Sequence, residues 1–437
     1  MYAWKLWKQL FNKEHLEEIF ENKISKSSST GLDKINVQKF SEILEDEMDI
    51  IIRKTHNDTY QFTRYRQLLF SKGKGKNPRV ISIPTVRDKL TTTALHELII
   101  NVFGDECKTA LPQEVINRIC NSFNQYDRYL KLDIETFYAS IQHELLSKKI
   151  YKKIRKREIY SLIMKAVKTE TVPFQPQDNE KKEERKEGIP EGLPISNALA
   201  NIYMLDLDKK YKGKEDIRYF RYVDDILVFL TEDNYEKVEK ELTRDINELG
   251  LKIKKEKLER GKLNTQFQYL GYILSNSKVT VRQSGIYRME QSLEEVIKNA
   301  LTKNKRYIEW KLNLKITGFI LDDNKYGWMF FYSQITDTDI LHHLDWLVKK
   351  LLVRYQLELD IHPKKFVRTY YEIRKALHTT KYIPNLNDYS IEDKRKLLTE
   401  IYGEILEDKS DKAVEYLFRK IMKKEIRDIE RDVEHIS

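Results

Sequence analysis

Apolar and polar positions along the first hundred residues follow three successive patterns. The N-terminal segment has apolar residues at helical spacing on either side of a polar stretch, which predicts two helices around a loop. Apolar runs on both sides of a Gly/Lys-rich stretch predict two strands joined by a turn. The expected elements are two helices within 1–56 around the loop 25–33, strands within 60–70 and at 80–83, and a helix over 85–104.

The middle of the chain alternates short strands with helices, and the last third is helical. Residues 169–188 contain two prolines and a run of charges, which predicts a solvated loop. From about residue 287 the pattern stays helical, so we place a domain boundary near 285. The expected strands are 129–133, two within 217–230, 266–274 and 278–282, and the expected helices are 142–168, 195–210, 234–249 and 411–435.

Composition allows one large or two moderate globular units and favours a polyanionic partner. Of 437 residues, 40% are hydrophobic, which supports a sizeable core, and the net charge is +10. The charge is concentrated: residues 60–90 hold eight Lys or Arg against one acid, and residues 349–381 hold nine against three. Both windows also contain aromatics, and this mixture suits a nucleic-acid backbone with exposed bases. Two solvated surfaces are the alternative.

Other features favour an intracellular protein. The two cysteines, Cys107 and Cys120, exclude a disulfide scaffold and a cysteine-based zinc cluster, and they fit a reducing compartment. No apolar run reaches the roughly 18 residues of a membrane-spanning helix. Residues 1–20 lack the apolar core of a signal peptide. We therefore expect a cytoplasmic protein with no membrane partner.

The strongest chemical signal is the pair Asp224-Asp225, which lies between two apolar strands. Side-by-side carboxylates at an apolar turn cost electrostatic energy unless a cation lies beside them. Asp133 ends another predicted strand; taken alone it fits a helix cap, but with the pair it completes a set of three carboxylates. Hard oxygen ligands suit Mg²⁺, and two such ions about 3.5–4 Å apart can bracket an in-line phosphoryl transfer.

These stretches resemble the motifs of reverse transcriptases. Residues 222–225, Tyr-Val-Asp-Asp, are similar to the family's Tyr-x-Asp-Asp, and residues 133–138 are similar to its Asp-x-x-x-Phe-Tyr. Residues 188–201 resemble Gly-x-Pro-Gln-Gly-x-x-x-Ser-Pro-x-Leu-x-Asn. The motifs that close the palm are matched by Gly250-Leu251 with Lys257 and by residues 267–271. In order and spacing, the resemblance covers residues of about 25–275.

The resemblance implies an α+β, right-hand polymerase fold. Fingers and palm would share an antiparallel sheet that carries the acids, and a helical thumb would follow at the C-terminal end. The implied regions are N-terminal helices and fingers at 1–128, the palm at 129–285 with part of the fingers at 142–195, and the helical thumb with a C-terminal extension at 286–437.

The resemblance also implies roles for individual residues. The catalytic set is Asp133, Asp224 and Asp225; these, with Ile134, would hold two Mg²⁺ ions, and Mn²⁺ would be able to replace them. Tyr138 would pack under the incoming sugar and block a 2′-hydroxyl, with a plain core tyrosine as the alternative. The nucleotide-binding set is Lys72, Arg79, Phe137, Tyr138, Glu191 and Gly192, with Lys74 and Lys76 as alternatives to Lys72. The primer/template set is Tyr222, Val223, Tyr269, Leu270, Gly271, Lys349, Lys350, Lys364 and Lys365.

Two positions depart from the family pattern. The expected Gln is Glu191, and the expected Pro is Asn197. A glutamate near a triphosphate repels it unless a Lys or Arg neutralises it or its side chain turns away. We therefore expect altered nucleotide preference or an unusual template. Asp206 and Asp208, which follow this motif, are expected to face solvent.

The sequence looks like a bacterial reverse transcriptase of the group II intron/retron-like class, most similar to the defence-associated, anti-phage enzymes. That resemblance implies an RNA-directed DNA polymerase that makes cDNA from dNTPs. Its implied partners are a non-coding RNA, as template or scaffold, and further copies of the same chain. Two alternatives stay open: an RNA-binding maturase or scaffold with this fold, and a nucleotidyl transferase with weak template guidance.

Overall fold

The computed structural model describes residues 3–25, 29–71, 77–174, 184–299, 304–406 and 408–433. These residues form a mixed α+β protein, which confirms the expected class. They divide into two compact units, each discontinuous in sequence: the first contains 1–110 and 128–260, and the second contains 111–127 and 261–437. The limits of 128 and 285 given above concern fingers, palm and thumb, not compact units, and they stay a prediction.

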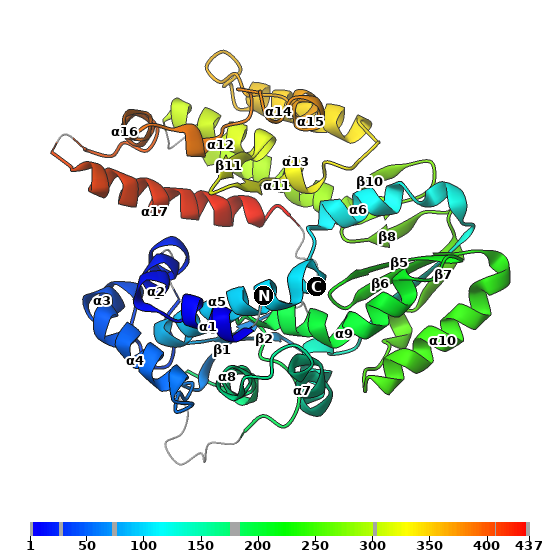
Figure 1. Ribbon diagram of the computed structural model, residues 1–437. Helices are drawn as coiled ribbons and strands as arrows, with labels where there is room; N and C mark the ends of the chain where they lie inside the picture. The colour runs from blue at the N-terminus through cyan, green and yellow to red at the C-terminus, as the bar shows by residue number, and fades with distance from the viewer. Residues whose placement is uncertain are drawn as a thin grey trace. The chain divides into compact units, whose positions relative to one another are not determined.

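Helices make up much of the first unit (Figure 1). The prediction of two helices within 1–56 is wrong in number, because Asn12 accepts a hydrogen bond from the His15 amide and begins a new helix. The predicted helix over 142–168 is also two helices. The helices are α1 (Ala3–Leu10), α2 (Lys13–Ile19), α3 (Val37–Glu42), α4 (Leu44–His56), α5 (Val86–Phe103), α7 (His143–Tyr151), α8 (Arg157–Lys168), α9 (Ser196–Lys212) and α10 (Tyr235–Glu248).

A four-stranded sheet of order β5-β6-β3-β7 carries the candidate acids. β6 pairs antiparallel with both β5 and β3. β7 was not predicted, because its four residues carry no strand pattern of their own. The strands are β5 (Ile217–Tyr222), β6 (Asp225–Leu230), β3 (Arg128–Asp133) and β7 (Glu259–Lys262).

Two helices cover one face of this sheet, α9 and α10 (Figure 1). Alternate residues of β6, Ile226 and Val228, lie in the same apolar core as Leu242 and Ile246 of α10. The period of two along a strand directs these side chains to one face. One face of the sheet therefore packs against helices, while the acids lie at the ends of its strands.

A second sheet in this unit has the order β2-β1-β4. β1 (Tyr65–Phe70) and β2 (Arg79–Ile83) pair antiparallel, which confirms the predicted strand pair, although residues 60–62 lie outside it. β4 (Thr171–Val172) adds to β1 in parallel and lies in a segment that was predicted to be a loop. A two-residue strand is defined by its partner, so local sequence does not reveal it.

The second unit contains two small sheets. β8 (Phe267–Tyr269), β9 (Tyr272–Leu274) and β10 (Val279–Val281) form the first, so the single strand predicted over 266–274 is in fact a hairpin. Its two turn residues both have positive φ, which is the geometry of a type I′ turn. β11 (Phe319–Leu321) and β12 (Asn324–Tyr326) form a second hairpin in a region that was predicted to be helical throughout.

The remaining elements of the second unit are helices. In the described part of the chain, we find no helix both long and apolar enough to cross a membrane. The helices are α6 (Pro112–Cys120), α11 (Gln283–Lys298), α12 (Lys305–Thr317), α13 (Trp328–Phe331), α14 (Asp339–Arg354), α15 (Phe366–Lys375), α16 (Ile391–Glu400) and α17 (Asp411–Glu430).

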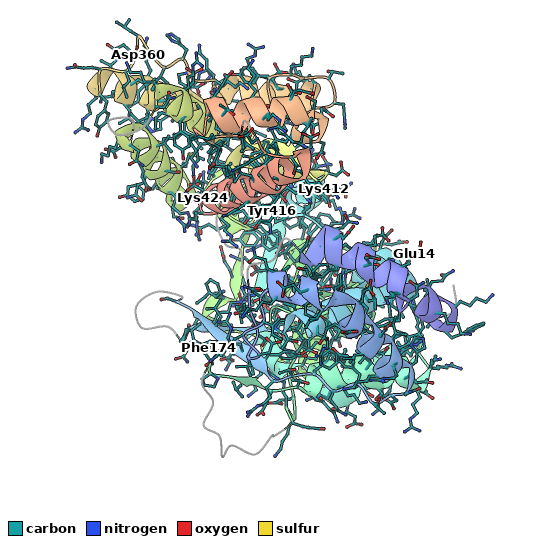
Figure 2. The ribbon with its side chains drawn as sticks, turned by 90° about the vertical axis from the view of Figure 1, so that its left-hand side faces the viewer. Glu14, Phe174, Asp360, Lys412, Tyr416 and Lys424 are labelled. Carbon is teal, nitrogen blue, oxygen red and sulfur yellow. The ribbon has the colours of Figure 1, made fainter. Side chains whose placement is uncertain are left out.

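The last helix, α17, is joined to α12 by buried charges. Lys315 of α12, only 2% exposed, donates hydrogen bonds to the Asp432 carboxylate at 2.7 Å and to the Asp428 carbonyl oxygen at 3.0 Å. The outer side of α17 carries Lys412 and Lys424, which Figure 2 labels. α17 is thus a packed element of this unit, with one ionic and apolar face and one solvated face.

Candidate active site

The hydrogen-bonded register of the strands brings the predicted acids together. Asp133, the last residue of β3, is the direct register partner of Asp225, the first residue of β6. Asp224 lies in the two-residue turn before β6, and its carbonyl oxygen accepts a bond from the Ile134 amide at 3.2 Å. The ladder therefore places three carboxylates and the Ile134 backbone at one end of the sheet.

The turn that bears Asp224 has an unusual backbone. Val223 has a φ of +54°, in the region that normally favours glycine in two-residue hairpin turns. A β-branched residue held there is strained by about 1–3 kcal/mol, so the surroundings must enforce it. Arg221 does so by donating a hydrogen bond to the Val223 carbonyl oxygen at 2.8 Å.

Behind the turn lies a buried ion pair that the sequence reasoning missed. Arg221 donates to both carboxylate oxygens of Asp208, at 2.8 and 2.6 Å, and to Asn201 at 3.1 Å. The side chains of Arg221 and Asp208 are each only 6% exposed. The expectation that Asp208 faces solvent is therefore wrong, whereas Asp206 is exposed as expected. Arg221 directly precedes the Tyr-Val-Asp-Asp motif at residues 222–225, but the sequence does not show which acid it pairs with.

Burial and mutual repulsion make the acids costly to ionise. Burial, followed by the charges of Asp224 and Asp133, raises the pKa of Asp225 to about 7. Burial and the Asp133 charge also raise the pKa of Asp224. Near neutral pH the site thus carries a proton or needs a cation, as expected for like charges placed side by side in a poorly solvated turn.

Lys257 supplies part of the required positive charge. Its ammonium donates to Asp133 Oδ2 at 2.5 Å. Burial alone would lower the pKa of Lys257, but the bond to Asp133 and the charges of the three acids raise it. The backbone just before Lys257 is hydrogen-bonded to the end of β3, where the Lys254 amide donates to the Asp133 carbonyl oxygen. These bonds place Lys257 near the acids.

The donor set fits hard divalent cations that bind together with a substrate. Within the described residues, no group of three or more His, Cys, Asp or Glu side chains is close enough to hold an ion alone. Mg²⁺ usually takes one or two carboxylates and completes its shell with water and substrate phosphates. Buried, mutually repelling carboxylates at a partly open strand end are suited to that incomplete kind of site.

Tyr138 lies beside the acids on a single 3₁₀ turn, Phe137–Ser140. Burial raises the pKa of Tyr138, and the negative charges of Glu191 and Asp224 raise it further. Its hydroxyl donates to the side-chain oxygen of Asn197 at 2.5 Å. Phe137 is 3% exposed and contacts the ring of Tyr138, so in this structure it is a core residue.

The loop at residues 188–192 joins the Tyr138 turn to β2. The Ile189 amide donates to the Tyr138 carbonyl oxygen at 2.7 Å, and the Ser82 amide donates to the Glu191 carbonyl oxygen at 2.6 Å. Gly192 has a φ of +103°, and a Cβ there would lie 2.7 Å from the Ile81 side chain. The need for glycine thus arises from close packing against β2.

Arg79, the first residue of β2, forms an ion pair with Glu191. Both side chains are about a quarter to a third exposed, at 30% and 25%. The positive charge of Arg79 also acts on Asp224 and lowers the pKa of that carboxyl, in opposition to burial. The departure at Glu191 is therefore neutralised by the arginine that was assigned to the triphosphate. Lys72, which was predicted to bind the nucleotide together with Arg79, lies outside the described residues.

The predicted primer/template residues fall in both units. Tyr222 and Val223 adjoin the acids in the first unit. In the second, the turn Leu270–Gly271 follows the buried Tyr269, and Lys349 and Lys350 are exposed on α14. Lys365 is exposed and Lys364 half-buried before α15, where the Lys364 ammonium donates to the Tyr382 carbonyl oxygen at 2.5 Å.

Comparison with known proteins agrees with this geometry. Residues 71–274 match the family model described as "Reverse transcriptase (RNA-dependent DNA polymerase)". The chain is 26% identical over 215 residues to the group II intron-encoded protein LtrA of Lactococcus lactis subsp. cremoris, covering 47% of this chain and 35% of LtrA. It is 29% identical over 173 residues to the "Uncharacterized 91 kDa protein in cob intron" of Schizosaccharomyces pombe, covering 38% and 21%.

Among solved structures, the chain matches telomerase from Candida albicans in complex with a fragment of telomeric RNA. The TM-score is 0.45 and the identity 11%, and the match covers 87% of this chain and 69% of that chain. The chain spans about a third of the length of LtrA and less of the fungal relative. The family match and the meeting of Asp133, Asp224 and Asp225 lead to one conclusion: residues 71–274 form a reverse transcriptase domain, distantly related to that of the group II intron-encoded proteins.

Proposed function

We propose that this protein is a cytoplasmic RNA-directed DNA polymerase that makes cDNA from dNTPs on an associated non-coding RNA, in defence against phage. The observation that carries the polymerase is the register of Asp133 against Asp225, with Asp224 in the adjoining turn. The family match over residues 71–274 supports it. The resemblance of the motifs to defence-associated enzymes supports the RNA partner and the role in defence.

In this proposal each residue near the acids has a task. Asp133, Asp224, Asp225 and the Ile134 carbonyl oxygen would hold two Mg²⁺ or Mn²⁺ ions. When bound, these ions supply positive charge that favours a 3′-oxygen nucleophile and a pyrophosphate leaving group. The chain itself prepares the site: Lys257 balances Asp133, and Arg221 fixes the turn that bears Asp224.

The nucleotide would be held by groups on β2 and on the turn after β3. The guanidinium of Arg79 would pair with phosphate oxygens, for which its planar fork is suited. The ring of Tyr138 would occupy the space that a 2′-hydroxyl needs. Deoxynucleotides would then be preferred over ribonucleotides.

Two exposed groups of aromatic and basic side chains support binding of an RNA. In the first unit, Phe174 is 45% exposed, with the Lys34 ammonium 5.6 Å and the Arg66 guanidinium 5.5 Å from its ring centroid; Figure 2 labels Phe174. In the second unit, Trp346 of α14 is 52% exposed, and the Lys350 ammonium lies 4.6 Å from its ring centroid. Such groups suit stacking of bases beside phosphates.

The direct test uses purified protein with its co-purifying nucleic acid retained. Mg²⁺ is added with each labelled dNTP singly and then with all four, and the product is sized and sequenced. We expect DNA from the wild-type protein and none from Asp224→Asn/Asp225→Asn. Glu215→Gln, which changes an exposed acid near β5, is the matched control and should make DNA normally.

The same experiment separates the alternatives. Product sequence that follows the bound RNA supports the templated polymerase, whereas DNA that is unaffected by removal or replacement of the RNA favours the weakly templated transferase. RNA bound equally by both forms, with no DNA from either, favours the maturase or scaffold. Plaque counts in cells that carry the wild-type or Asp224→Asn/Asp225→Asn protein test the role in defence, and the mass of the purified complex tests the proposed homo-oligomer.

A further inference from the structure

We propose that Glu191 limits the affinity of the site for a nucleoside triphosphate: its carboxylate pairs with Arg79, and the incoming triphosphate must compete with it for that guanidinium. This inference rests on the proposed function and adds a property of the same site. It concerns one of the two positions where the chain departs from the family pattern, and a neutral Gln at that position would not form an ion pair.

The ion pair lies where a substrate can reach it. The Arg79 and Glu191 side chains are 30% and 25% exposed, so neither is sealed in the core. The loop that carries Glu191 is also bonded to the turn that carries Tyr138, because the Ile189 amide donates to the Tyr138 carbonyl oxygen at 2.7 Å. A triphosphate that extends from the acids toward β2 therefore meets both members of the pair.

The two side chains are held face to face by the backbone. The Ser82 amide donates to the Glu191 carbonyl oxygen at 2.6 Å, which ties the loop to the strand that begins with Arg79. Gly192 fits against Ile81 only because it has no side chain. These contacts fix the backbone of Glu191 opposite Arg79, while its side chain can turn away when another anion takes the guanidinium.

The chemistry makes the two anions rivals. A guanidinium can bind a carboxylate or a phosphate in a similar bidentate geometry. In the unliganded protein the carboxylate has the advantage, because its backbone is already held in place. A triphosphate must displace it and must also accept a further negative charge nearby. Binding is then weaker than in a site with a neutral amide, and Glu191 sets the concentration of nucleotide at which the enzyme works.

The test compares KM and kcat for dNTP incorporation on a defined primer and RNA template. Glu191→Gln should lower the KM by about tenfold and leave kcat within twofold, because a neutral amide gives up the guanidinium more readily. In an Arg79→Gln background, the same change should alter the KM by less than about twofold, since there is no guanidinium to contest. Glu187→Gln, which changes an exposed acid directly before this loop, is the control and should leave both constants unchanged.

Two results would overturn the inference: an unchanged or higher KM in Glu191→Gln, or an equal fall in KM with and without Arg79, which would indicate general repulsion instead of competition. A binding measurement with a fluorescent dATP analogue and Ca²⁺ keeps the inference separate from catalysis. Tighter binding by Glu191→Gln with no DNA from any form supports the inference and contradicts the polymerase. DNA synthesis with identical binding by both forms contradicts the inference and keeps the polymerase.

Discussion

The hydroxyl of Tyr138 donates a hydrogen bond to the side-chain oxygen of Asn197, across 59 positions of sequence. The family pattern has a proline at position 197, which offers no such acceptor. Tyr138, whose ring is proposed to lie under the sugar, is therefore held by hydrogen bonds at its backbone carbonyl oxygen and at its hydroxyl.

Loss of that bond should loosen sugar selection. We expect Asn197→Ala to lower the preference for dNTP over rNTP by about three- to tenfold, the effect of one net hydrogen bond. In a Tyr138→Phe background the same change should have no further effect, because the hydroxyl is gone. The ratio of kcat/KM for dNTP to kcat/KM for rNTP measures this preference. An equal effect of Asn197→Ala in both backgrounds would contradict the prediction.

Without metal, Asp225 should make the first unit less stable as pH rises. Its pKa, raised to about 7 in the folded protein, exceeds that of an unfolded aspartate, so the folded state binds more protons between about pH 4 and pH 7. Stability is thus full at low pH and is lost as the pH rises through 7. In EDTA, from pH 5 to pH 8, wild type should lose about 2–3 kcal/mol more than Asp225→Asn.

Urea unfolding at the two pH values measures this difference. Glu215→Gln should follow wild type, since that acid is exposed. Saturating Mg²⁺ with a nucleotide should reduce the pH dependence, because metal binding requires the ionised carboxylates. Parallel pH profiles for wild type and Asp225→Asn would show that the acid is not repelled in the folded state.

Arg221 should support both folding and the geometry of the turn. Arg221→Met leaves Asp208 buried without its cation, and we expect a loss of about 3–5 kcal/mol in the free energy of unfolding. The Val223 carbonyl oxygen also loses its donor, so kcat should fall by at least tenfold. Arg218→Met, an exposed arginine on the same strand, is the control. Full stability in Arg221→Met would contradict this account of the turn.

Lys349 and Lys350 of α14 should contribute to nucleic-acid affinity. Reversing both charges should weaken binding of a primer and RNA template and reduce the slope of log affinity against log salt by roughly 1–2. Lys412→Glu/Lys424→Glu, on the exposed side of α17, makes the same change in net charge elsewhere in that unit. Equal slopes for the two double variants would remove α14 from the binding surface.

The buried charges between α12 and α17 should stabilise the second unit as a set. Lys315→Met leaves the Asp432 carboxylate without a cation, which should cost about 3–5 kcal/mol. Hydrogen exchange should show faster exchange of α17 amides, with little change in the first unit. Adding Asp432→Leu should recover part of the loss, whereas Lys325→Met, on an exposed strand residue, should have no effect.

The acids could be proposed from sequence because their motif is local. Two strand-like runs joined by two residues form a hairpin, and that alone places Asp224 beside Asp225. Asp133 comes from a separate strand; its place at a strand end suggested it as the third carboxylate, and the resemblance supported that grouping before the register showed it. The order of the family's motifs thus supported the prediction of a long-range contact, which hydrophobic periodicity alone cannot predict.

Charge pairing across the fold was not predictable in this way. Nothing local distinguishes the buried Asp208 from the exposed Asp206 on the same helix, and their fates differ because Arg221 faces only one of them. The pair of Arg79 and Glu191 joins positions 112 residues apart. β4 and β7 were missed for a related reason, since each is defined by the strand beside it.

The division of the chain into interleaved units bears on how it is made. Helix α6, with Val115, Ile116 and Ile119 buried, belongs to a unit whose other residues leave the ribosome much later. During synthesis the apolar side chains of α6 stay exposed until residues 261–437 have been made, so chaperones or other chains can bind them. A chain ended at residue 260 would keep it uncovered permanently, so production of the first unit alone calls for a short polar linker in place of residues 111–127.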